Sequence, residues 1–203
     1  MKREALSRQA LARHEAGHVV ALAALGGLGG FSWRRHSRYE LAHVAEPQVA
    51  VEAWDESAAR DQMIARRAVV ALAGGAAEGH AILSETGPTN DPAVIHAWTG
   101  SVDFELAHEW LTLQRYDGSQ PAILADIVRL FGEVSAFLAR PTQQYALAIV
   151  AGRMIALLDG ADHAGQTELV LPAAPLIEGL VLDPAPQFVL RETIQAAGGR
   201  RMT

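Results

Sequence analysis

Cysteine is absent from the 203 residues of this chain. Its absence excludes disulfide bonds, thiolate-ligated zinc and cysteine nucleophiles, so any transition-metal site must use histidine and carboxylate side chains. Lysine is nearly absent as well, since Lys2 is the only one. A phosphate-binding glycine loop ends in a lysine, and no such loop occurs, so the sequence predicts no ATPase module.

Excess positive charge is also missing, because 17 basic residues stand against 23 acidic ones and give a net charge of −6. This balance argues against a nucleic-acid partner and against an anionic membrane surface. The most apolar stretches, Val19–Leu25 and Tyr145–Leu158, are shorter than the roughly 20 residues that span a bilayer. With no secretion signal at the charged N-terminus, we expect no membrane insertion and a cytoplasmic protein.

Half of the residues are hydrophobic, which is enough to build a substantial core. Apolar periodicity and helix-start signals predict a mainly α fold with a small β element. The expected helices cover residues 3–25, 57–83, 99–114, 122–139 and 142–158. Partly alternating aromatic residues predict one or two short strands within Phe31–Val44. Beyond Gly160, repeated prolines predict an extended arm packed on the body or on a partner.

The segment Arg13–His18, "RHEAGH", carries the strongest chemical signal. His14 and His18 lie four positions apart, so on a helix both imidazoles share one face and can bind the same ion. Glu15 is rotated one step away, which suits a general base. Zinc lowers the pKa of a bound water, Glu15 takes its proton, and the water attacks a polarised peptide carbonyl. The alternative is a pair of core histidines with ordinary hydrogen-bond partners.

Two further blocks extend this signal, "ALAGGAAEGH" at residues 71–80 and "TGSVDFELA" at residues 99–107. Together with "HEAGH" they resemble the peptidase domain of the FtsH-type, ATP-dependent zinc proteases, in order and in separation. The resemblance implies a zincin-like, mainly helical peptidase domain over residues 1–160, here without its ATPase. The Pro-rich extension at residues 161–203 has no counterpart in it.

The resemblance also implies the remaining site residues. Asp103 matches the aspartate that opens a helix and supplies the third zinc ligand. Asp91 is a rival, because Asn90 precedes it as in the family, although Pro92 makes it look like a helix cap. Glu78 matches a glutamate near the zinc and would hold the outer N–H of a histidine. The alternative for Glu78 is a solvated helix residue.

The expected function is that of a zinc metalloendopeptidase acting on peptides or unfolded segments. Substrate backbone would add to an edge strand within Phe31–Val44, and the alternative is an ordinary structural hairpin. The family works as a hexameric ring, so a homo-oligomer or a separate ATPase partner remains open. The alternative function is a non-proteolytic module that binds a peptide or subunit and retains the zinc-bound peptidase fold.

Overall fold

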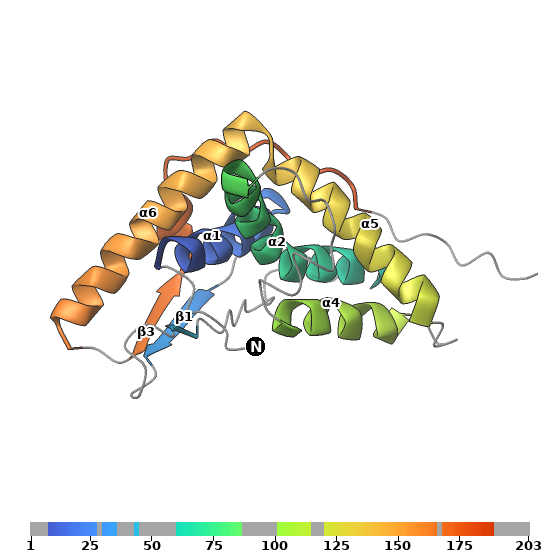
Figure 1. Cartoon of the computed structure of the whole chain (residues 1–203), viewed down its shortest axis with the longest axis horizontal. Helices are drawn as coiled ribbons and strands as arrows, with labels where there is room; N and C mark the ends of the chain where they lie inside the picture. The colour runs from blue at the N-terminus through green and yellow to red at the C-terminus, as the bar shows by residue number, and fades with distance from the viewer. Residues whose placement is uncertain are drawn as a thin grey trace, which may run out of the picture.

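The computed structural model describes residues 8–27, 30–35, 43–44, 60–86, 101–114, 120–165 and 168–188, and it is mainly helical (Figure 1). The helices are α1 (Arg8–Ala24), α2 (Arg60–Thr86), α4 (Ser101–Gln114), α5 (Gln120–Leu138), α6 (Pro141–His163) and the short α7 (Ala173–Ile177). The strands are β1 (Gly30–Arg35), β2 (His43–Val44) and β3 (Glu168–Pro172). The predicted mainly α class is thus confirmed.

Helices α1 and α2 cross at the centre of the molecule (Figure 1). Nearly every described side chain from Ala12 to Leu22 is buried, as is the run from Ala68 to Gly79. Helix α1 is surrounded by other elements, since it contacts α2, α5, α6 and α7. It ends in a Schellman motif: Gly26 has a φ of 76°, and Gly27 N–H donates to the carbonyl of Leu22 at 3.0 Å.

The crossing of α1 and α2 is unusually close because of Gly17. A Cβ added there would overlap the carbonyl oxygen of Ala73 and lie 2.7 Å from Cβ of Ala77. Only a residue without a side chain lets the two backbones approach this far. The glycine between the two histidines therefore fixes how α2 passes beneath the face of α1 that carries them.

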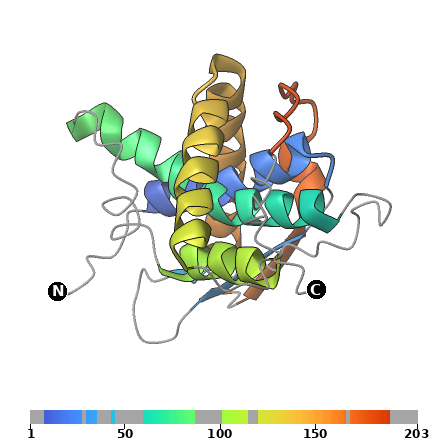
Figure 2. The same cartoon turned by 90° about the vertical axis from the view of Figure 1, so that its right-hand side faces the viewer.

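The other long helices pack around this pair. Helix α4 lies alongside α2 in both views (Figures 1 and 2). Helices α5 and α6 form the two arms of an inverted V, with Pro141 at the start of the second arm (Figure 1). Pro141 occupies the first turn of α6, where its missing N–H breaks no helical hydrogen bond.

The three strands form one antiparallel sheet in the order β2-β1-β3. Strand β1 pairs with β2 only through Arg34 and Arg35, but with β3 from Gly30 to Arg34. The segment Phe31–Val44 thus contains a short hairpin whose longer strand is central in the sheet. The partner on its other side comes from the C-terminal region, for which an extended arm packed on the body or on a partner was expected.

That C-terminal region is packed on the body as far as residue 188. Leu176 of α7 and Phe188 are buried and belong to the main hydrophobic core. Arg153 of α6 donates hydrogen bonds to the carbonyl oxygens of Leu176 and Glu178, both at 2.9 Å. These contacts satisfy carbonyls at the end of α7 and hold the segment against α6.

One helix among the described residues, Pro141–Ala161 of α6, is long and apolar enough to cross a membrane by length and composition. The sequence analysis counted only its inner part and judged it too short. A third of its apolar window is buried inside the structure.

Candidate metal centre

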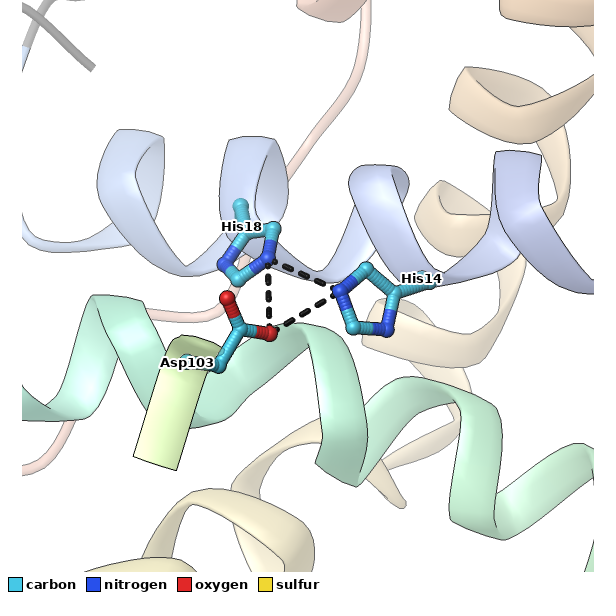
Figure 3. Close-up of side chains that lie close together, drawn as sticks. All are labelled: His14, His18 and Asp103. Atoms are coloured by element: carbon cyan, nitrogen blue, oxygen red, sulfur yellow. Dashed lines mark hydrogen bonds and ion pairs between the residues drawn. The ribbon is translucent and has the colours of Figure 1, made fainter. Parts of the chain in front are cut away.

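Three side chains from two helices that are far apart in the sequence, α1 and α4, converge on one point (Figure 3). His14 and His18 extend from successive turns of α1, and their Nε2 atoms lie 3.3 Å apart. Asp103, in the first turn of α4, places Oδ2 2.9 Å from Nε2 of His14 and 3.4 Å from Nε2 of His18. Two imidazole nitrogens and one carboxylate oxygen therefore form a compact triangle.

The contacts of the two Nδ1 atoms, which point away from the triangle, fix the orientation of both imidazole rings. His18 Nδ1 lies 2.7 Å from the carbonyl oxygen of Val70 on α2, and since a carbonyl only accepts, Nδ1 is the donor. His14 Nδ1 lies 3.2 Å from Oε2 of Glu78, which is fully buried. With both Nδ1 atoms donating, the lone pairs of both Nε2 atoms point toward each other and toward Asp103.

Acceptor atoms this close to each other repel one another unless a proton or a metal ion lies among them. Asp103 Oδ2 is buried and makes no hydrogen bond of good geometry within the described residues. A zinc ion holds nitrogen and oxygen ligands at about 2.0–2.2 Å, so tetrahedral ligands lie roughly 3.4 Å apart. The two longer sides of the triangle, 3.3 and 3.4 Å, match that value. The third side, from His14 to Asp103, is shorter at 2.9 Å, and the three residues together could hold a metal ion.

Gly74 of α2 forms the wall behind this triangle. A Cβ added at Gly74 would overlap Nε2 of His18 and lie 2.6 Å from Nε2 of His14. It would therefore occupy the space beside the two ligand atoms. The sequence analysis did not assign Gly74 to the site. A glycine inside a helix costs about 1 kcal/mol relative to alanine, and this cost marks Gly74 as unusual in the sequence. Only the fold reveals that its neighbours are the two imidazoles.

Glu15 directly follows His14 on α1 and is 3% exposed. Its Oε2 is buried and has no hydrogen-bond partner among the described residues. Burial raises the pKa of Glu15, opposed by the charges of His18 and His14. A carboxylate with a raised pKa and one uncommitted oxygen is suited to accept a proton.

The ionisation of the triangle is strongly coupled. Burial favours neutral His14, but the nearby carboxylates of Asp103 and Glu78 outweigh it and raise its pKa to about 10. Burial likewise opposes the charged form of Asp103, yet the two histidines lower its pKa. In the metal-free protein, a proton on His14 therefore supplies the positive charge that the three acceptors need.

We expect zinc affinity to rise with pH because the ion must replace this proton. The His14 proton stabilises the metal-free fold fully below pH 6.5, and this contribution is lost as the pH approaches about 10. Displacing one proton changes the apparent affinity about tenfold per pH unit between pH 7 and 9. Competition titrations with a chelating dye would measure this slope, and calorimetry in two buffers would count the proton. An affinity independent of pH would contradict the assignment.

The other candidate residues lie elsewhere. Asp91, the rival third ligand, lies outside the described residues. His108 is on α4, but its Nε2 contacts Gln120 at 2.8 Å rather than the triangle. Arg13, which the sequence analysis did not single out, donates from Nε to the carbonyl of Ala77 at 3.0 Å. This contact holds α1 to the turn of α2 that carries Glu78.

Within the described part of the chain, His14, His18 and Asp103 are the one group of three or more potential metal ligands whose atoms all lie within 4.8 Å of one another. No protein-family model, curated protein or solved structure matches the chain.

Proposed function

We propose that the protein is a zinc-dependent metallopeptidase of the FtsH type that hydrolyses peptide bonds in peptides or unfolded segments. The observation that carries this proposal is the triangle of His14, His18 and Asp103, together with the buried carboxylate of Glu15 one residue after His14. Two histidines and one carboxylate are a common donor set for catalytic zinc, and they leave one coordination position open.

Each residue has a distinct task in this proposal. His14, His18 and Asp103 would hold the ion, while Glu78 and the carbonyl of Val70 keep the imidazoles oriented. Zinc in such a site lowers the pKa of water and polarises a carbonyl oxygen. Oε2 of Glu15 is the atom available to take the proton from the attacking water and to pass it to the leaving amine.

The presence of Glu15 favours an enzyme over a module that only binds a peptide or subunit. A binding module needs the metal ligands at most, whereas a buried carboxylate with a raised pKa costs stability near neutral pH. This cost in stability is justified if the Glu15 carboxylate transfers a proton during the reaction. A cytoplasmic location and a partner that delivers unfolded chains, either other copies of this protein or a separate ATPase, belong to the same proposal.

Metal-dependent cleavage of an unfolded protein tests this function. Purified protein carrying one equivalent of zinc should cut casein, lose this activity when a chelator removes the metal, and regain it when zinc is restored. Asp103→Ala should lose both zinc and activity, because two histidines alone bind zinc weakly and leave the ion exposed to chelators.

Asp91→Ala is the matched control, because it removes the rival carboxylate and should keep both zinc and activity. Loss of zinc in the Asp91 variant alone would move the third ligand to that residue. Stoichiometric zinc with no cleavage of casein or of a broad peptide library, together with tight binding of a peptide, would instead support the non-proteolytic module.

A further inference from the structure

Arg67 of α2 is a cation for which the described part of the chain provides no acidic partner. Its guanidinium carbon lies 4.1 Å from the centre of the Trp110 ring on α4. Its Nε is buried and has no hydrogen-bond partner within the described ranges, while the residue as a whole is half-buried. Burial lowers the pKa of the guanidinium. Stacking fixes the plane of the group and leaves its N–H edge for an acceptor.

Arg67 lies on the same face of α2 as the metal centre. Gly74, behind the two Nε2 atoms, is seven residues further along the helix, and seven residues make about two turns. On α4, Asp103 and Trp110 are also seven residues apart. Asp103 meets the histidines near Gly74, and Trp110 meets Arg67. The two helices are thus antiparallel in this register, and Arg67 lies about 10 Å along them from the metal ligands.

Between these two points α4 offers an apolar surface. Leu106, three residues after Asp103, is 37% exposed, and Trp110 is half-buried. Asp103, Leu106 and Trp110 share one side of the helix, since residues three and seven apart lie above one another. A strip therefore runs from the metal ligands over Leu106 to the stacked pair of Trp110 and Arg67.

We propose that Arg67 binds a carboxylate of the substrate, so that the enzyme cuts peptides near a negatively charged group. This inference rests on the proposed peptidase function. An extended peptide advances about 3.3 Å per residue, so a carboxylate at Arg67 stands about three residues from the bond at the metal. A C-terminal carboxylate and an acidic side chain have the same chemistry, and both fit a guanidinium edge.

Peptide binding to a non-cleaving protein tests this assignment separately from catalysis. The zinc-loaded Glu15→Gln variant would be dialysed against pools of random N-acetylated heptapeptides without Asp or Glu, one with free C-terminal carboxylates and one amidated. A third pool, amidated but containing Asp and Glu, tests acidic side chains. We expect the free acids or the acidic amides to bind roughly tenfold more tightly than the neutral amides. Adding Arg67→Gln should remove this difference.

Two further variants identify the cause. Arg140→Gln is the matched control, because Arg140 also lies over an aromatic ring, Phe137 at 5.3 Å, and is 44% exposed. It should keep the tenfold preference. Arg67→Lys keeps the charge but loses the forked donor, and it should retain only part of the preference. If both the Arg67→Lys variant and the parent Glu15→Gln protein bind charged and neutral peptides equally, Arg67 only supports the packing of α4. The same conclusion follows if no pool of peptides binds.

The outcome is distinguishable from failure of the peptidase proposal. A zinc-loaded wild-type protein that cuts nothing but binds acidic peptides through Arg67 would refute catalysis and keep the carboxylate site. A protein that cuts neutral and acidic peptides equally well, and whose KM is the same in Arg67→Gln, would keep the peptidase proposal and refute the carboxylate site. Mass spectra of the products would also show whether cuts cluster three residues before the carboxylate.

Discussion

Replacing Glu15 with glutamine is expected to slow peptide cleavage by about 10²- to 10⁴-fold, the usual contribution of a general base. Glutamine keeps the size of the side chain but cannot accept the proton. The zinc content should not change, because Glu15 is not one of the three ligand residues. The fold should tolerate the change, since burial already opposes the charged form of Glu15. Initial rates on a fluorogenic peptide, with zinc measured on the same samples, would test both parts.

Glu178→Gln is the matched control for this experiment. Glu178 is exposed at the end of α7, so its change from carboxylate to amide should leave the rate within a factor of two or so. If Glu15→Gln cleaves as fast as the wild type, another group activates the water, and the role given to Glu15 is wrong.

Adding a single methyl group to the wall of the metal centre should abolish zinc binding. In Gly74→Ala the new Cβ overlaps Nε2 of His18 and approaches Nε2 of His14 to 2.6 Å. Both imidazoles must turn away, and the ligand triangle is lost. We expect zinc affinity to fall at least about a hundredfold, more than for the loss of an outer-shell hydrogen bond, and cleavage to fall with it. Inductively coupled plasma analysis and dye competition would measure the zinc.

The metal-free Gly74→Ala protein should still fold. Its clash is with the ends of two side chains, which can rotate, and alanine is about 1 kcal/mol better than glycine inside a helix. Gly152→Ala is the matched control, because a Cβ there meets nothing within 4 Å. It should bind zinc normally and melt at a slightly higher temperature. Normal zinc binding by Gly74→Ala would mean that the ion does not sit beside this wall.

The sequence was most informative where the structure depends on local spacing. His14 and His18 are four residues apart on a helix, so their common face follows from helical geometry alone. The break before α6 follows from Pro141, and the end of α1 from Gly26 and Gly27. In each case one or two residues determine the backbone over a single turn.

Features that depend on long-range packing were not accessible in this way. Nothing near β1 in sequence indicates that Glu168–Pro172 would pair with it, and the prolines around that segment suggested an arm instead. The stacking of Arg67 on Trp110 depends on the register of α2 against α4. The glycines at 74 and 75 do not interrupt α2, which continues to Thr86, and their letters alone do not indicate that Gly74 faces imidazoles.

The contact of Gly17 with the Ala73 carbonyl has a consequence for metal selectivity. Because the two backbones touch, α2 has a fixed place beneath α1, and so do the Val70 carbonyl and the Glu78 carboxylate that orient the two imidazoles. The nitrogens are preorganised during folding, so capturing an ion costs little further conformational entropy. A rigid triangle of this size favours small tetrahedral ions and disfavours those that need six ligands, such as magnesium. Discrimination between metals would thus depend on the absence of a side chain at Gly17.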